Sequence, residues 1–152
     1  MASPPTALQG VEMDRQAVDD CLRNEGVGIL ALTDGDEAYG VPLSFGYDGD
    51  SRLYFLFLGL GETSKKEQLA TQTEMASFTV TSVQSKHEWQ SVIATGSVVS
   101  VPDTENDDLY AAIEDNAWYP SLFSESDPLT GVRGWALEIE TVTGRSADGS
   151  KR

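Results

Sequence analysis

Two adjacent lysines follow a stretch rich in glycine and hydroxyl residues, GLGETSKKEQL, at residues 59–69. A Walker-type phosphate loop needs glycine directly before its lysine and a hydroxyl residue directly after it. Here Ser64 precedes Lys65 and Lys66 follows it, so the order of side chains excludes a nucleotide-triphosphatase loop. The SKKE sequence instead matches a capping box, in which the side chains of Ser64 and Glu67 satisfy each other's backbone amides at a helix start.

The capping box does not explain the lysines themselves. The positive end of the helix dipole lies at the N-terminus and disfavours each ammonium group there by roughly 0.3 kcal/mol or more. A bound phosphate would reverse this effect, because backbone N–H groups and both ammonium groups would then point at one anion. Spacing leaves two alternatives open: a phosphate site at Ser64, Lys65 and Lys66, or a solvated pair of surface lysines.

A second candidate site lies in residues 38–47, AYGVPLSFGY, where large and small side chains alternate. The large ones are Tyr39, Val41, Leu43, Phe45 and Tyr47, and the small or flat ones between them are Gly40, Pro42, Ser44 and Gly46. Gly and Pro are poor interior strand residues, so we expect an edge strand or the close approach of another body. A planar ring could lie on such bare backbone, whereas tight packing at a barrel corner would select the same residues.

The other residues that could take part in chemistry do not indicate a specific site. His87 is the only histidine and lies in a polar turn, which argues against a histidine-based metal cluster or a Cys/His catalytic pair. We therefore expect no metal site. Carboxylates are so abundant that no acid–base pair can be assigned, and the catalytic residues stay unknown. Trp89 is expected to be a packing residue, although its place at a strand mouth would let it lie over a ligand.

The composition indicates one acidic, folded domain. The chain has 152 residues, a formal charge of -15 and a single cysteine, Cys21. This charge repels nucleic acid and anionic membranes, and the scattering of the acids suggests a halophilic source. A lone cysteine cannot form an internal disulfide. No apolar segment approaches membrane-spanning length and no leader pattern is present, so a cytoplasmic, soluble protein is expected.

Periodicity predicts three helices and six strands, which lie between a loose segment at residues 1–13 and a polar tail at 144–152. The predicted helices cover residues 13–26, 63–72 and 103–118. The predicted strands cover residues 27–33, 38–47, 52–58, 75–83, 89–101 and 134–144, with a bend or bulge at Gly96. The apolar runs at 27–33 and 52–58 are expected to be buried. Hairpin logic makes the sheet mostly antiparallel, and a small, partly open β-barrel with peripheral helices is the expected fold.

In this order, residues 28–55, the lysine-bearing helix start, residues 75–80 and residues 89–98 resemble a known family. It is the pyridoxamine 5'-phosphate oxidase-like family of FMN-binding split β-barrel proteins, and the subgroup related to nitroimidazole-resistance proteins looks closest. The resemblance covers roughly residues 14–143 and rests on the order of the segments. It implies a six-stranded antiparallel split β-barrel that forms a homodimer, with FMN between the two barrels.

Carried over by position, the resemblance implies a cofactor site. The residues beside the isoalloxazine ring would be Val41, Pro42, Leu43 and Ser44. Lys66, with Lys65 and Ser64, would hold the phosphate, and Trp89 and Ser91 would border the cofactor. The chain departs from the subgroup after residue 55: where a histidine, small residues and a glycine commonly precede the lysine, it has the apolar and longer LFLGLGETSKK. The arginines with which the parent oxidase holds its substrate's phosphate have no match here.

The leading hypothesis is an FMN-binding flavoprotein that acts as an oxidoreductase on an unknown substrate. One alternative is a binding or storage protein for another planar cofactor, such as a deazaflavin or haem. The other is a dimeric scaffold without a cofactor, which the apolar residues at 56–58 would suit.

Overall fold

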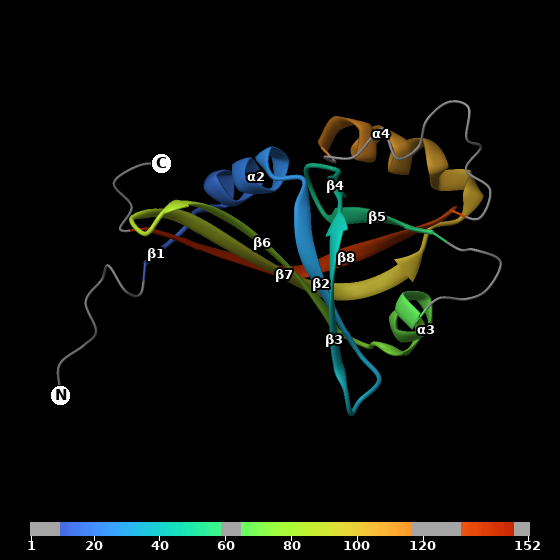
Figure 1. Ribbon diagram of the computed structural model, residues 1–152. Coiled ribbons are helices and arrows are strands. Elements are labelled where there is room, and N and C mark those ends of the chain that lie inside the picture. Colours follow the sequence, from blue (N-terminus) through green and yellow to red (C-terminus); the bar gives the residue numbers. More distant parts are fainter. Residues whose placement is uncertain (1–9, 59–64, 117–131, 148–152) are drawn as a thin grey trace.

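The computed structural model describes residues 10–58, 65–116 and 132–147, in which one antiparallel sheet carries three α-helices (Figure 1). The strands are β1 (Val11–Glu12), β2 (Val27–Thr33), β3 (Ala38–Ser44), β4 (Gly46–Tyr47), β5 (Arg52–Leu58), β6 (Ala76–Ser85), β7 (Glu88–Ser100) and β8 (Val132–Ser146). The helices are α2 (Arg15–Asn24), α3 (Lys65–Gln72) and α4 (Asn106–Asn116), and a 3-10 turn (Asp103–Glu105) precedes α4. The six long strands and three helices correspond to the predicted elements. The predicted strand 38–47 divides at Phe45 into β3 and β4.

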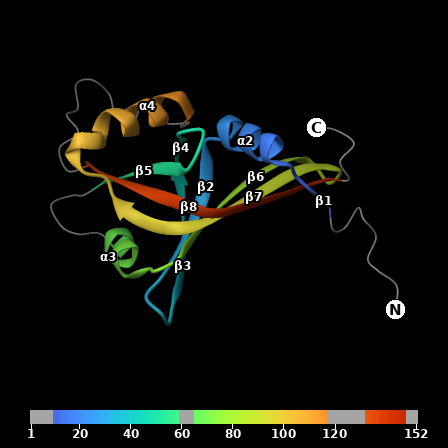
Figure 2. The same cartoon turned by 180° about the vertical axis from the view of Figure 1, so that it is seen from behind.

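The order of the strands closes the sheet on itself. It runs β3-β2-β6-β7-β8-β5-β4, with β1 pairing on β8. β3 and β4 lie at opposite ends of this order, yet only Phe45 separates them along the chain. The sheet must therefore curl until its two ends approach each other, and Figures 1 and 2 show this curled shape. The predicted fold class, a mainly β split barrel, is confirmed.

Two apolar clusters hold the fold together. The larger one fills the inside of the curl, where Phe78 packs against Phe45 and Phe55 with ring centroids 5.0 Å apart. Helix α2 contributes its predicted apolar face to this cluster, namely Val18, Cys21 and Leu22. The smaller cluster lies between α4 and the outer face of β5 and β8. Because α4 covers that outer face, Leu53, Tyr54 and Phe55 are all buried, as predicted for this strand.

Strand β2 differs from its prediction. The apolar run VGILALT was expected to be buried, but burial alternates along it. Leu30 and Leu32 face the inner cluster, whereas Ile29 is 44% exposed. A continuous apolar run does not show whether one or both faces are covered, because that depends on which helix lies on the sheet. Within the described ranges no helix covers the outer face of β2.

Gly96 lies at the predicted irregularity in β7. Thr95 pairs with Thr141 and Gly96 pairs with Ile139, so Glu140 is an extra residue on β8. A Cβ atom at Gly96 would overlap the carbonyl group of Glu138, and only glycine fits there. Such a bulge bends the ribbon and increases its twist.

The helix starts follow from local chemistry. The Asp14 side chain accepts a 2.9 Å hydrogen bond from the Ala17 amide and caps α2. The α3 helix begins at Lys65, directly after the serine that was expected to cap it, and its C-terminal end is held by Thr73. The Thr73 hydroxyl accepts from the Thr33 amide at 2.9 Å and lies 2.7 Å from the Leu69 carbonyl oxygen. None of the helices in the described parts of the chain is long and apolar enough to cross a membrane.

Candidate functional site

The outer face of the sheet carries two rows of small or β-branched residues that no described helix covers. We call these ten residues the open face. The register gives the first row as Pro42, Ile29, Thr79, Ile93 and Thr143, and the second as Gly40, Ala31, Ser77, Thr95 and Thr141. Each row crosses five strands, from the β3 edge to β8. The hydroxyl groups of Thr95 and Thr141 are hydrogen-bonded to each other within the second row.

The open face is apolar at its centre and carries no charge. Ile29 and Ile93, which flank Thr79, are 44% and 45% exposed. Charged residues make up 23% of the chain, but none lies among these ten positions. An uncharged surface with two half-exposed isoleucines is a feature that interaction surfaces and ligand-binding surfaces share.

The edge strand β3 borders the open face with bare backbone. The Phe45 amide donates to the Gly26 carbonyl oxygen at 3.1 Å, which fixes the alternation along the strand. Residues 41 and 43 therefore direct their backbone groups at β2, and residues 40, 42 and 44 direct theirs away from it. A Cβ atom at Gly40 would meet only one atom within 4 Å, Cγ2 of Ile29 at 3.5 Å. The predicted edge position is confirmed, and tight packing does not explain this glycine.

Gly46 lies on the small-residue face of the same segment, but glycine is needed there for a different reason. A Cβ atom there would lie 2.5 Å from the backbone of Ala112 in α4. Close helix packing therefore excludes any larger residue at Gly46. The predicted small-residue face thus combines two requirements, an open edge at Gly40 and a close contact at Gly46.

The structure divides the four residues that were expected beside a ring. The side chain of Val41 is buried in the inner cluster and Leu43 packs against that cluster, so both point away from the open face. Pro42 is exposed in the first row. Ser44 is half-buried, and its hydroxyl donates to the Gly26 carbonyl oxygen at 3.1 Å. Only Pro42 and the neighbouring Gly40 present an accessible surface to a planar ligand.

The predicted phosphate residues are only partly described. Lys65 and Lys66 form the first turn of α3, which contacts β2 and β7. Their side chains, and the whole of Ser64, lie outside the described residues, so the capping box and the phosphate site stay predictions.

The other predicted border residues lie on β7. Trp89 is half-buried, and a Cβ atom at Gly10 would lie 2.6 Å from Cη2 of its indole ring. The indole thus packs on the segment before β1. Ser91 pairs with Thr81, next to the first row of the open face. His87 is exposed in the β6–β7 turn, where its amide donates to the Ser85 hydroxyl.

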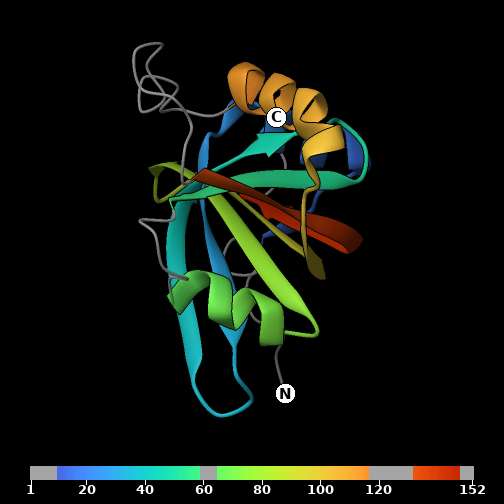
Figure 3. The ribbon, with the colours of Figure 1, turned by 90° about the vertical axis from the view of Figure 1, so that its right-hand side faces the viewer.

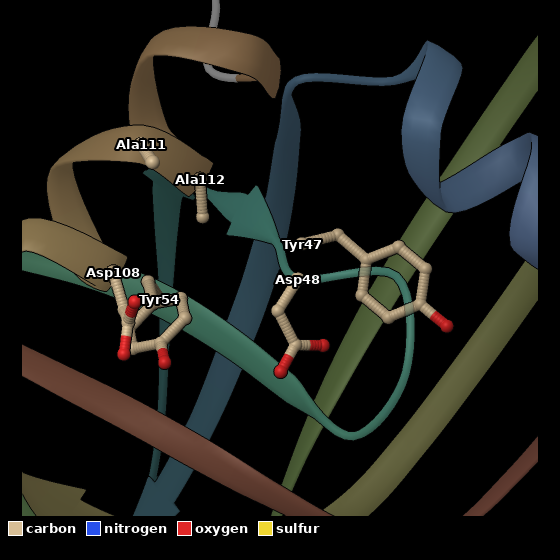
Figure 4. Close-up of a pocket in the computed structure, with 6 residues that line it drawn as sticks. All are labelled: Tyr47, Asp48, Tyr54, Asp108, Ala111 and Ala112. Carbon is tan, nitrogen blue, oxygen red and sulfur yellow. The ribbon is translucent and has the colours of Figure 1, made fainter.

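A separate pocket of about 610 Å³ lies between α4 and the β4–β5 hairpin (Figure 4). Its lining residues are Tyr47, Asp48, Tyr54, Asp108, Ala111 and Ala112. None of the predicted site residues is among them. The Asp48 side chain accepts from the backbone amides of residues 50, 51 and 52 at 2.8, 2.9 and 3.0 Å. This carboxylate therefore shapes the hairpin turn.

The polar end of Tyr47 is also committed to the fold. Its hydroxyl donates to Asp19 at 2.7 Å and accepts from Arg15 at 3.2 Å, and Figure 4 shows it directed away from Asp108. Burial raises the pKa of Asp19, but hydrogen bonds from Tyr47 and Arg15 outweigh it and leave that pKa below its usual range. Burial and the hydrogen bond to Asp19 raise the pKa of Tyr47. These groups connect α2 to the hairpin rather than serving a ligand.

Two further kinds of chemistry have no support in the described residues. Burial, together with the nearby Glu25, raises the pKa of the Cys21 thiol to about 11, so the reactive thiolate form is scarce. Across residues 10–58, 65–116 and 132–147, no three His, Cys, Asp or Glu side chains gather in a way that could hold a metal ion.

The sequence did not identify the open face, because Ile29 sits in an apolar run and its exposure depends on which helices cover the sheet. One signal was present in residues 77–81 of β6. Serine and threonine alternate there with buried residues and no charge appears, although the chain is strongly acidic.

Comparison with known proteins adds family and fold. A family profile described as pyridoxamine 5'-phosphate oxidase matches residues 14–146. A FAD-binding protein from Mesorhizobium loti aligns with a TM-score of 0.71 at 23% identity, over 91% of this chain and 98% of that one. A candidate 5-nitroimidazole antibiotic resistance protein from Bacteroides thetaiotaomicron aligns with a TM-score of 0.70 at 21% identity, over 90% of this chain and 86% of that one. A FAD and heme binding protein from Mycobacterium smegmatis aligns with a TM-score of 0.69 at 17% identity, over 90% of this chain and 72% of that one.

A search of curated protein sequences finds no significant match. At the identities quoted, the solved structures establish a shared fold and no more.

Proposed function

The chain belongs to the pyridoxamine 5'-phosphate oxidase family, and from this premise we propose that it is an FMN-binding flavoprotein with oxidoreductase activity on a small molecule. The observation that carries the proposal is the bare edge at Gly40 and Pro42, which adjoins the uncharged open face. Proteins of the same fold that are described as binding FAD, or FAD and heme, support a planar cofactor in general.

The residues present fit a flat ring. At Gly40 no side chain stands above the backbone, and a Cβ atom would have only the Ile29 methyl group near it. The backbone N–H and C=O of Gly40 point away from β2 and can bond ring heteroatoms. Lys65 and Lys66, with Ser64, would hold the phosphate of FMN at the start of α3. When bound, FMN supplies the electron transfer, and the protein supplies binding, orientation and exclusion of water.

Haem is less well supported than a flavin. The only histidine, His87, is exposed in the β6–β7 turn, and the thiol of Cys21 is buried with a raised pKa. Neither residue offers an axial ligand at the open face. A deazaflavin would occupy the same flat edge as FMN and differs in its absorbance spectrum.

The first experiment is the absorbance spectrum of the freshly purified protein, followed by titration with FMN. We expect a flavin spectrum, or a thermal shift on adding FMN to colourless protein. If the protein stays colourless and high FMN concentrations leave its melting temperature unchanged, FMN is not its cofactor, and the same titration with a deazaflavin and with haem separates a protein for another planar cofactor from the cofactor-free scaffold.

The lysine pair is tested by comparing FMN with riboflavin, which lacks the phosphate. Charge-assisted hydrogen bonds to the phosphate are worth about 1.5–3 kcal/mol each, so the wild type should bind FMN at least about tenfold more tightly than riboflavin. The double variant Lys65→Ala, Lys66→Ala should lose most of this preference and keep only the part that Ser64 and the backbone N–H groups supply. Lys86→Ala removes an exposed lysine from the β6–β7 turn and should keep the preference for FMN. An unchanged preference in the double variant would place the phosphate elsewhere.

The proposal includes a homodimer in which the open face of one copy covers that of the other. The two half-exposed isoleucines and the lack of charge support it, because like-charged chains can approach most closely through an uncharged surface. The variant Ile93→Glu should be monomeric in light scattering. Met75→Glu changes a residue that is 52% exposed outside the two rows and should stay dimeric. A dimeric Ile93→Glu variant would rule out this surface.

A further inference from the structure

The charges of the chain lie outside the ten residues of the open face. The formal charge is -15. Exposed acids lie on the described helices, among them Asp20 on α2 and Asp107 and Glu114 on α4, and also on β8, where Glu138 and Glu140 lie beside the end of the open face. Two of the arginines are already bound by acids: Arg15 pairs with Asp19, and Arg52 pairs with two glutamates. The ten residues of the open face carry no charge.

We propose that ionic strength controls the association of two copies through the open face, and through it the occupancy of the cofactor site. This inference rests on the proposed function, because it takes the second copy as the body that covers the open face. The open face itself supplies attraction without charge, from apolar contact at Ile29 and Ile93. The rest of each copy supplies repulsion, which depends on salt.

The range of this repulsion decides the effect. The Debye length is about 8 Å at 0.15 M salt and about 3 Å at 1 M, whereas the chain has a radius of gyration of about 15 Å. At physiological salt the charges of two touching copies are therefore incompletely screened. Coulomb repulsion between two bodies of this charge predicts that the dimer dissociation constant falls on the order of tenfold between 0.15 M and 1 M salt. FMN that is held between two copies should gain occupancy as the dimer forms, although the higher salt also weakens its contacts with the lysine pair.

Salt can also strengthen apolar contacts directly, and the test must separate the two effects. The triple variant Asp20→Asn, Asp107→Asn, Glu114→Gln removes three negative charges at exposed helix positions outside the open face. If repulsion is the cause, this variant should dimerise several-fold more tightly than the wild type at 0.15 M KCl. Its dissociation constant should also change less between 0.15 M and 1 M.

Analytical ultracentrifugation of the full chain in KCl measures the dissociation constant, circular dichroism checks that the fold is intact, and FMN fluorescence reports occupancy. A dimer whose dissociation constant does not change with KCl would overturn the salt control and leave the homodimer standing. An equal salt response in the triple variant and the wild type would also overturn it, since apolar strengthening would then be the cause. A monomer at every salt concentration would remove both the inference and the homodimer on which it rests.

Discussion

Gly40 and Gly46 should respond in opposite ways to the addition of a side chain. They lie on the same small-residue face of residues 38–47. The surroundings of a Cβ atom differ, however: at Gly40 only Cγ2 of Ile29 lies within 4 Å, at 3.5 Å, whereas at Gly46 the backbone of Ala112 lies at 2.5 Å. We therefore compare the variants Gly40→Val and Gly46→Ala for stability without cofactor and for FMN affinity.

The magnitudes follow from these distances. Glycine inside a strand costs about 0.5–1 kcal/mol relative to a residue with a side chain, so Gly40→Val should leave the free energy of unfolding unchanged or raise it by up to that amount. At Gly46 the clash is with backbone, which cannot rotate away, and Gly46→Ala should lose about 1–3 kcal/mol. Valine at position 40 places two methyl groups where the flat ring would lie. The FMN dissociation constant should therefore rise more than about tenfold, which corresponds to about 1.4 kcal/mol.

Urea unfolding of the cofactor-free proteins measures the stabilities, and quenching of flavin fluorescence measures the affinities. The decisive comparison is FMN affinity in Gly40→Val, because this variant keeps its fold. Wild-type affinity in a stable Gly40→Val protein would show that the ring does not lie on the bare edge, and the proposed site would have to move.

Three further predictions concern the fold. Gly96→Ala should lose about 2–3 kcal/mol or fail to fold, because the new Cβ atom would overlap the Glu138 carbonyl, and a loss below about 0.5 kcal/mol in urea unfolding would contradict the bulge geometry. Leu109→Ala removes a fully buried side chain from the packed face of α4 and should cost about 2–5 kcal/mol by the same measurement, whereas a near-neutral result would mean that α4 is not packed as described. Asp19→Asn weakens the contacts to Tyr47 and Arg15 and should cost about 1–2 kcal/mol at pH 7. Because the folded pKa of Asp19 is lowered from an ordinary value of 3.8, its stabilisation is present above that value and is lost as the pH falls below it. The difference between wild type and Asp19→Asn should therefore shrink below about pH 4 in unfolding experiments, and a constant difference would contradict the assignment.

The sequence predicted the elements well because their signals are local. The apolar face of α2, the alternation in β6 and the glycine of β7 at the irregularity each depend on neighbours within a few residues. The break at Phe45 was missed, since the alternation of large and small residues continues through it although the chain moves from one end of the sheet to the other. That change depends on barrel closure, which is a property of the whole sheet (Figure 3).

The candidate site was only partly predictable for the same reason. The bare edge at Gly40 and Pro42 was visible in the sequence, because missing side chains are a local fact. The inward direction of Val41 and Leu43 follows equally from alternation, but carrying residues over by position had grouped them with Pro42. The open face was not predictable. Ile29 and Ile93 are exposed because α4 packs on the outer face of β5 and β8 and does not extend over β2 and β7.

The bare edge at Gly40 and the lack of charge in the two rows are distinct properties of the open face. Two variants test them separately. Gly40→Val blocks the edge and should keep the dimer, because valine adds apolar surface without charge. Ile93→Glu places a carboxylate in the middle of the first row and should separate the copies. If the cofactor lies between two copies, Ile93→Glu should lose FMN together with the dimer. If one copy binds the cofactor alone, Ile93→Glu should bind FMN as a monomer, and salt control of assembly would then leave cofactor occupancy unaffected.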